Sequence, residues 1–471
     1  MAGSFWYRLQ PRGSTRWVLT MLGMIFMLLI VMGGAGVVAI GPDGRDRVVV
    51  IVPTLSDMQE KYKTIQEHLV ETGYAVTVKA LDAPDTAEIL LMQDGEYVFD
   101  TAVSLVPRAQ NLGPGWSAGA VLDFVDQGGS VFVAADYNYG AFTKQLAAGL
   151  GVQLDDKLNV VIDHGSFDAG LDQDGSHSFI KAGGVTKAKP IVNAGSPSAS
   201  SILFKGVGAS LYTSNELVEP VLWGSPSAYC GRKFESATDI PLASGNEVVL
   251  GAVLQARNTG TGRGAYIGGV AMLQDQVMQL AGVKHRDFYL DLLSWTCGER
   301  GVLKAENVRH WLANNGEQRG TYKVQDDIGF ALDVFEWAGA LGHWIPTTPE
   351  DMQVEFTMLN PYIRARLVPL VSESSGESAS MHANLTIPDV IGIYKFEIAY
   401  VRTGYSHVAL MENVNVRPFW HNEYERFIPQ AYPYYASAFV MMGSLIVFTA
   451  VVLYGKPTVD AERQHKAKDA R

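Results

Sequence analysis

The sequence predicts an α/β parallel-sheet domain, then a β-sandwich-like domain, and finally one C-terminal transmembrane helix. Between residues 40 and 300, short buried runs of β-branched residues alternate with segments of helical periodicity, which is the order of βαβ units. From 301 to 421, short alternating strands are separated by turn signals, a pattern that favours an antiparallel sandwich. Residues 434–454 contain 21 residues without a charge, and at ~1.5 Å per residue they cross a hydrocarbon core of about 30 Å.

The α/β region begins with a continuous apolar run that is typical of a buried parallel strand. A helix capped by Ser56 or Asp57 follows, runs through Glu71 and ends at Gly73, because a glycine suits the position after a helix. A second helix begins at Ser117 and stops at Gly128-Gly129. The strands predicted in this half are Val48–Val52, Tyr74–Val78, Val98–Val106 and Val131–Val133. Their alternation with helices predicts a parallel sheet.

Later segments continue this pattern less regularly. Predicted strands are Val160–Ile162, Val248–Leu250 and Ala265–Ile267, a closing helix covers Tyr289–Trp295, and loops cover Asn193–Ser201 and Gly224–Cys230. In the second region the predicted strands are Val354–Met358, Ala365–Val371, Met381–Ile387, Tyr394–Ile398 and Val408–Val416. The boundary between the two regions is placed near Glu299–Lys304, where the period changes.

Both ends of the chain carry membrane signals. Trp17–Ile40 has a basic lead, an apolar middle and small residues up to Ala39, which predicts a signal peptide over 1–39, with an uncleaved signal anchor as the alternative. After the C-terminal span, the tail holds five Lys/Arg in 17 residues, whereas the 18 residues before the span hold only Arg417 and Arg426. The positive-inside rule therefore puts the tail in the cytosol and the bulk of the chain in the lumen. The predicted divisions are 1–39 leader, 40–300 α/β domain, 301–421 β-rich domain, 422–433 juxtamembrane segment, 434–454 transmembrane helix and 455–471 tail.

Charge argues against a nucleic-acid partner. The chain has a net charge of −12, of which the leader contributes +3 and the tail +2, so the part between them carries −17. Binding to nucleic acid calls for a basic face. An acidic region of this kind is compatible with a soluble luminal domain.

Two cysteines and one sequon suggest covalent modification. Cys230 and Cys297 lie in the translocated part, where an oxidising compartment permits a disulfide between them. Two separate buried thiols are the alternative, and the sequence does not decide between the two. Asn384-Leu385-Thr386 is a sequon, so Asn384 is a candidate glycosylation site.

The search for a catalytic or cofactor site finds weak signals only. The loop after the first strand lacks the glycines of a dinucleotide or phosphate site, and no nucleophile follows Val133. Asp163-His164 follows a strand and could form a carboxylate–imidazole dyad for general acid/base work, with a hydrogen-bonded turn as the favoured alternative. Asp172-x-Asp174 is a lone pair of acids in a Gly/Ser-rich loop, which favours a solvated turn over a metal site. We therefore predict no catalytic residue, no metal and no cofactor.

The transmembrane helix itself carries a pattern of small side chains. Ala436, Gly443 and Ala450 are seven residues apart, with Ser437 and Ser444 beside them. A seven-residue spacing returns to nearly the same face of a helix, and small residues let a second helix approach closely. We call these five residues the small-residue stripe and expect it to pack against a partner helix.

The residues around this helix also resemble a known family. Glu423–Pro429 followed by Ala431–Phe439 is similar to the signature of the 48-kilodalton subunit family of the oligosaccharyltransferase complex. Further blocks in the family's order are Gly128–Val131, Val133–Ala135, Val161–His164, Phe204–Gly208, Leu254–Asn258 and Gly404–His407. The resemblance covers nearly the whole translocated region and the span.

The resemblance implies a type I membrane protein of the endoplasmic reticulum. It implies an amidotransferase-like α/β luminal domain without the catalytic cysteine, then a β-rich domain, one helix and a short cytosolic tail. The implied role is a non-catalytic subunit that supports assembly of the complex for en bloc transfer of a lipid-linked oligosaccharide to Asn of N-x-S/T sequons. Implied partners are the other subunits, including the catalytic subunit and a ribophorin II-type subunit. The tail departs from the family, since Lys466 and Lys468 stand six and four from the end, whereas related tails often carry lysines at five and three.

Two other classes of function remain as hypotheses. The first is a single-pass luminal hydrolase or transferase that uses Asp163 and His164. The second is a luminal receptor for a glycan or a peptide. Association with other subunits is the observation that separates the assembly role from both.

Overall fold

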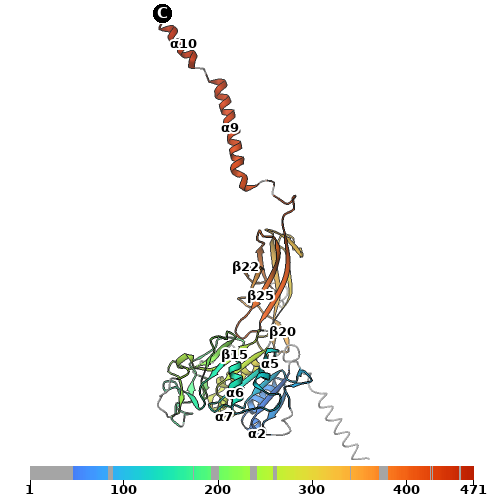
Figure 1. Ribbon diagram of the computed structural model, residues 1–471, viewed down its shortest axis with the longest axis vertical. Coiled ribbons are helices and arrows are strands. Elements are labelled where there is room, and N and C mark those ends of the chain that lie inside the picture. The colour runs from blue at the N-terminus through green and yellow to red at the C-terminus, as the bar shows by residue number, and fades with distance from the viewer. Residues whose placement is uncertain are drawn as a thin grey trace, which may run out of the picture.

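The computed structural model describes residues 46–470, apart from 83–88, 173, 193–200, 234–240, 258–261, 340, 371–379, 425, 427 and 456–457. The signal peptide or anchor predicted over 1–39 lies outside these residues, as do residues 193–200 of one predicted loop. Figure 1 shows an α/β unit at one end, a sandwich of long strands above it, and helix α9 leaving from the far end of the sandwich.

The α/β unit is built on a ten-stranded mixed sheet whose main order is β10-β13-β15-β16-β6-β5-β1-β2. Five neighbouring strands are parallel: β2 (Ala75–Ala80), β1 (Arg47–Val52), β5 (Thr101–Ser104), β6 (Ser130–Ala134) and β16 (Arg263–Ile267). The other pairs are antiparallel and join β15 (Val249–Gln255), β13 (Val218–Trp223) and β10 (Gly184–Val185). β12 (Ala209–Leu211) pairs with β15, and β7 (Val152–Leu154) pairs with β12. The prediction of a parallel sheet is therefore correct for these five strands and wrong for the rest. β15 is joined by a short connection to β16, its neighbour in the sheet, and two neighbouring strands joined in this way are antiparallel.

Two other predictions for this unit need correction. Val160–Ile162 does form a strand, β8 (Asn159–Ile162), but it pairs with β14 (Tyr229–Arg232) outside the large sheet. β14 begins inside the segment predicted as a loop. Two further short ladders join β3 (Met92–Gln93) to β4 (Glu96–Tyr97) and β9 (Ile180–Lys181) to β11 (Leu203–Phe204).

The helices cover both faces of the sheet. The segment predicted as one helix is two, α2 (Leu55–Glu60) and α3 (Lys63–Glu71), and its first cap is Thr54, whose Oγ1 accepts from the Asp57 backbone N–H at 3.2 Å. The remaining α-helices among the described residues of the unit are α5 (Ala118–Asp126), α6 (Ala141–Gly149), α7 (Asp275–Ala281) and α8 (Val283–Thr296). Ser117 caps α5 as predicted, through a bond from the Ala120 N–H to its Oγ.

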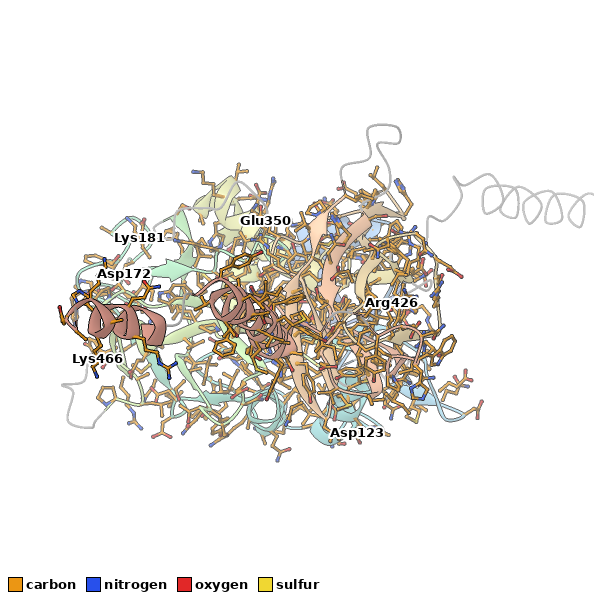
Figure 2. The ribbon with its side chains drawn as sticks, turned by 90° about the horizontal axis from the view of Figure 1, so that it is seen from above. Asp123, Asp172, Lys181, Glu350, Arg426 and Lys466 are labelled. Atoms are coloured by element: carbon orange, nitrogen blue, oxygen red, sulfur yellow. The ribbon has the colours of Figure 1, made fainter. Side chains whose placement is uncertain are left out.

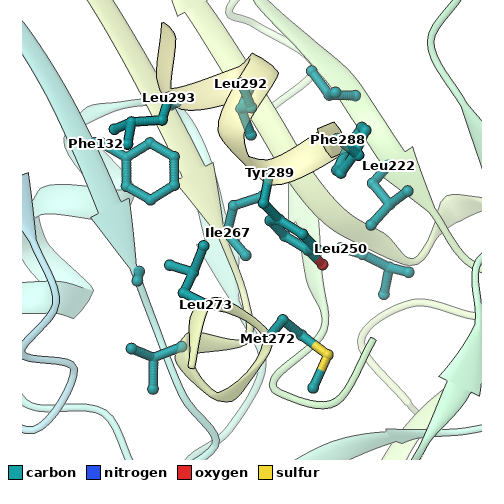
Figure 3. Close-up of a cluster of buried hydrophobic side chains, with 14 of the residues drawn as sticks. Phe132, Leu222, Leu250, Ile267, Met272, Leu273, Phe288, Tyr289, Leu292 and Leu293 are labelled. Carbon is teal, nitrogen blue, oxygen red and sulfur yellow. The ribbon is translucent and has the colours of Figure 1, made fainter. Parts of the chain in front are cut away.

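Alternating side chains of the strands fill two separate cores. On β1, Val48 and Val50 face one core while Val49 and Ile51 face the other, as expected for a strand buried on both faces. The first core includes α3 and α8, and the second includes α5 and α6. Figure 3 shows Phe288, Tyr289, Leu292 and Leu293 of α8 against side chains of the sheet.

The following region forms two five-stranded sheets with a common core, in line with the predicted sandwich. One sheet has β17 (Leu303–Leu312), β19 (Asp327–Ala338), β24 (Ser380–Thr386), β23 (Val368–Pro369) and β20 (His343–Pro346). The other has β18 (Thr321–Lys323), β26 (Val408–Arg417), β25 (Gly392–Tyr400), β21 (Gln353–Met358) and β22 (Asn360–Arg366). Phe330 and Phe396 meet between the sheets with ring centroids 4.8 Å apart. All pairs are antiparallel except β18 with β26, and the long strands β17 and β19 were not predicted.

Beyond the sandwich, the chain continues into α9 (Tyr432–Tyr454) and α10 (Thr458–Lys468). The stretch Pro429–Tyr454 is long and apolar enough to cross a membrane, and none of it is buried within the protein. The predicted transmembrane helix is confirmed to this extent.

Candidate functional site

The Asp163 turn is the first place where the sequence suggested chemistry. Asp163 follows β8 and is fully buried. Its carboxylate accepts hydrogen bonds from the Ser227 hydroxyl at 2.7 Å, from the backbone N–H groups of Gly165 and Ser166 at 2.8 and 3.0 Å, and from the Ser225 hydroxyl. Burial alone would raise the pKa of Asp163, but these four bonds outweigh it and lower that pKa. The carboxylate is therefore held as a structural anion.

The neighbouring imidazole has different partners. His164 is exposed, its Nδ1 lies 2.5 Å from Nδ1 of His177, and its Nε2 lies 3.0 Å from the Tyr229 hydroxyl. The His177 ring in turn stacks on Phe167 with centroids 4.1 Å apart. Among the described residues, no hydrogen bond joins Asp163 to His164. The two side chains are adjacent in sequence but point to separate partners, which favours the hydrogen-bonded turn over the dyad.

The Asp172-x-Asp174 pair is also committed to local partners. Asp172 Oδ2 accepts from the His177 backbone N–H at 2.7 Å, and Asp174 Oδ2 lies 3.0 Å from Lys233 Nζ. That ammonium holds the pKa of Asp174 well below its usual value. Across the described ranges, no group of three or more His, Cys, Asp or Glu residues could hold a metal ion. Figure 2 shows Asp172 and Lys181 on the same side of the molecule. Asp174 is exposed, as expected for a solvated turn, whereas Asp172 is buried under its own loop.

The carboxyl edge of the parallel strands, where ligands bind in open α/β sheets, has a pocket of about 610 Å³. Arg108 follows β5 and Asp136 follows β6, and their Nη2 and Oδ2 atoms are 3.8 Å apart. Burial raises the pKa of Asp136. The sequence analysis found no nucleophile at this edge and did not predict the pair of Arg108 and Asp136. The order of the strands could have indicated it, because the residues that follow neighbouring parallel strands lie at the same edge of the sheet.

The two cysteines are separate thiols in the structure. Cys230 lies on β14 and Cys297 follows α8, and both are free and buried. Burial raises the pKa of Cys230 to about 12, so its thiolate, the reactive form, is suppressed. Of the two alternatives left open by the sequence, the structure contains the unpaired one.

The predicted glycosylation site lies on a strand. Asn384 is an exposed residue of β24 opposite Gly329. The hydroxyl of Thr386, the third residue of the sequon, donates to Asp327 Oδ1 at 2.7 Å. The side chain of Asn384 is thus at the surface, where a glycan could be accommodated.

The small-residue stripe lies on a helix with no packing partner within the described chain. No residue of α9 is buried. The hydroxyls of Ser437 and Ser444 donate to carbonyl oxygens of their own helix, Tyr434 and Met441, both at 2.8 Å. At ~1.5 Å per residue, Tyr432–Tyr454 is about 35 Å long, which exceeds a hydrocarbon core of about 30 Å. Packing of the stripe against another helix therefore stays a prediction.

Comparison with known proteins covers most of the chain. Residues 42–299 match the family described as "OST48, N-terminal domain", and residues 310–456 match "OST48 middle domain". Curated relatives named "Dolichyl-diphosphooligosaccharide--protein glycosyltransferase 48 kDa subunit" are known from three organisms. The Arabidopsis thaliana protein is 32% identical over 422 residues, covering 87% of this chain and 93% of the relative. The Danio rerio protein is 30% identical over 454 residues, covering 94% and 97%, and the Caenorhabditis elegans protein is 32% identical over 428 residues, covering 88% and 92%.

Likeness to solved structures is weaker. The structure titled "mmIFT52 N-terminal domain" aligns with a TM-score of 0.38 and 11% sequence identity, covering 53% of this chain and 96% of that one.

Proposed function

This chain belongs to the OST48 family, and we propose on that basis that it is a non-catalytic subunit of an oligosaccharyltransferase complex. The complex transfers a lipid-linked oligosaccharide en bloc to Asn of N-x-S/T sequons, and this subunit supports its assembly. The observation that carries the proposal is the extent of the match, which includes both sheet regions and the C-terminal apolar helix. The relatives match along at least 92% of their own length.

The geometry at Asp163 supports an accessory role over the enzymatic alternative. A general base needs a free lone pair within reach of a substrate proton, whereas the Asp163 carboxylate is occupied by two serine hydroxyls and two backbone N–H groups. The hydrogen-bond partners of His164 in the described part of the chain are His177 and Tyr229, and neither is a carboxylate. A hydrolase or transferase built on these two residues would have to break an already satisfied turn.

We propose that α9 spans the endoplasmic reticulum membrane once, with the bulk of the chain luminal and the tail cytosolic. The excess of Lys/Arg in residues 455–471 over 416–433 supports this orientation. The domain division at 300/301 is supported by the chain itself, since Gly301 stands between α8 and β17 in a left-handed conformation with φ +68° that favours glycine.

The partners that we propose are the other subunits, including the catalytic subunit and a ribophorin II-type subunit. Two features support contacts of this kind. The small-residue stripe offers a face for a transmembrane helix, and α9 has no partner within the described chain. Glycosylation at Asn384 is a further proposal, supported by the exposure of its side chain.

The proposal is tested by purifying the full-length protein from membranes in mild detergent and identifying what travels with it. We expect other oligosaccharyltransferase subunits in one stable particle. A monodisperse single polypeptide would contradict an assembly role. His164→Ala separates the two classes of function: a scaffold should keep its partners and support glycosylation of a reporter, whereas an enzyme should stay assembled and lose turnover.

A further inference from the structure

The end of the sandwich nearest α9 presents an unusual set of exposed apolar residues. Leu359 forms the tight turn between β21 and β22 and is 99% exposed, with a φ of +68°. A left-handed conformation is uncommon for a leucine and is normally given to Gly, Asn or Asp. Ile391 and Ile393, at the start of β25, are 59% and 69% exposed. We call Leu359, Val390, Ile391 and Ile393 the apex.

Strand pairing brings these segments together with the exit toward the membrane helix. An added Cβ at Gly392 would lie 2.6 Å from Met358 Sδ, so the β21–β22 turn touches the start of β25. Gly392 also pairs with Val416 at the end of β26. The apex therefore lies at the same end of the sandwich as the end of β26. Figure 1 shows that the chain leaves for α9 from the end of the sandwich that is remote from the α/β unit.

The connection to α9 is partly folded and short. Arg417 makes two bonds to the Glu423 carboxylate, at 2.7 and 2.9 Å, and its guanidinium lies 4.1 Å from the centre of the Trp420 ring. This turn holds residues 417–423 against the end of β26. From Glu423 to the 3-10 turn Pro429–Ala431 that precedes α9, a chain of this length reaches at most about 20 Å. The end of β26, and with it the apex, is thus tied by a short connection to the start of α9.

We propose that the apex is a lipid-contacting surface, whose leucine and isoleucine side chains enter the headgroup boundary of the same bilayer that α9 crosses. Exposed aliphatic side chains at this depth gain burial without a protein partner. Trp420 and Tyr424, in the connection between β26 and α9, are 61% and 60% exposed, and such rings prefer the membrane–water interface. The segments 356–363 and 387–393 contain one acid, Asp389, and no base, so insertion is apolar and does not depend on anionic lipid.

The test uses the full-length chain in phosphatidylcholine vesicles with a spin label attached through Leu359→Cys or Ile393→Cys. Leu280→Cys on α7 is the matched control, because Leu280 is also 69% exposed but lies on the α/β unit. Cys230 and Cys297 are buried and stay unlabelled, which the wild-type protein verifies. We expect oxygen, which dissolves in the bilayer, to speed the spin relaxation of the apex labels. A water-soluble nickel chelate should relax the apex labels several-fold less than it relaxes the label at 280. Added phosphatidylserine should leave this result unchanged.

Two results would overturn the proposal. The first is an apex label as open to the nickel chelate as the label at 280. The second is shielding that is absent from the isolated chain and arises only in a parallel sample reconstituted with its co-purified partner subunits, which would make the apex a protein interface. Because the lipid contact is measured on the isolated chain, its failure leaves the proposed subunit role untouched.

Discussion

The indole of Trp295 on α8 donates its Nε1–H to the carbonyl oxygen of Gly404, in the turn between β25 and β26, at 2.8 Å. This bond joins the α/β unit to the sandwich across 109 residues of sequence. The Arg263 guanidinium lies 4.7 Å from the centre of the same ring and donates to the carbonyl oxygens of Trp295 and Arg300 at 2.6 and 2.7 Å. Trp295 is fully buried. The two sheet regions thus meet at a buried tryptophan, whose hydrogen bond is one of several polar contacts between them. The others include the Thr403 hydroxyl with the Glu219 carboxylate and the Gly339 N–H with the Glu299 carbonyl oxygen.

Trp295→Phe should loosen this joint. The substitution leaves the Gly404 carbonyl without its donor and removes part of a buried ring, so we expect a loss of about 1–3 kcal/mol. Limited proteolysis near residue 300 should become faster, and the thermal midpoint should fall. Trp420→Phe, at an exposed tryptophan, is the control and should change neither. Equal proteolysis of both variants would show that the Trp295 bond does not hold the joint.

His285 should make the fold sensitive to acid. The side chain is fully buried, its Nδ1 accepts from the Leu203 backbone N–H at 3.2 Å, and burial lowers its pKa to about 4. The folded state therefore favours the neutral ring. The contribution of His285 to the free energy of unfolding is present above the pKa of about 6.5 that the ring has in the unfolded chain, and it is lost as pH falls toward 4. Lowering the pH from about 7 to about 5 should reduce the free energy of unfolding by about 2 kcal/mol through this single group.

His285→Gln keeps an acceptor and a donor without a titrating group. We expect the wild type to lose more unfolding free energy than this variant over the same pH interval, measured by denaturant unfolding in detergent. The variant is compared with His421→Gln, at an exposed position. Parallel pH profiles for wild type and His285→Gln would refute the assignment.

Asp163 and His164 should differ sharply in their effect on stability. Asp163→Ala leaves two hydroxyls and two backbone N–H groups without an acceptor, and we expect a loss of about 3 kcal/mol or more. His164→Ala removes an exposed side chain and should change stability by about 0.5 kcal/mol at most. Thermal unfolding of both variants checks this. A large loss for His164→Ala would mean that its contacts with His177 and Tyr229 are structural.

The two cysteines should behave as free thiols. Burial raises the pKa of Cys230 to about 12 and also raises that of Cys297, so the folded protein should not react with a thiol reagent at neutral pH. Unfolding without reductant should release two reactive thiols, those of Cys230 and Cys297. If thiols are released only after a reductant is added, the alternative of a disulfide is correct.

Enlarging the small-residue stripe should weaken assembly. Gly443→Leu with Ala450→Leu places bulk where a second helix would approach, and we expect partner subunits to be lost on detergent purification. The single variants Ala450→Leu and Ala438→Leu make the same change in size, and Ala438 lies on the opposite face of α9 by the 100° spacing of helical residues. Equal co-purification for these two variants would remove the stripe from the interface.

Much of the fold could be predicted from local patterns in the sequence. The uncharged run 434–454 could be identified as a span because length and charge alone decide the cost of crossing a bilayer. The buried run Val48–Val52 was recognisable as a strand because β-branched apolar residues suit a sheet that is covered on both faces. The family could be identified for a similar reason, since its signature is a contiguous stretch of sequence.

Partners distant in sequence were decided only by the tertiary structure. The direction of β15 depends on which strand it joins, and a single strand's composition has no preference for either direction. The adjacency of Asp163 and His164 suggested a dyad, yet Ser225 and Ser227, more than sixty residues away, occupy the carboxylate. Apolar periodicity is a property of a contiguous segment and can be recognised in the sequence. Hydrogen-bond partners and strand direction depend on segments that are remote in sequence and meet only in the folded core.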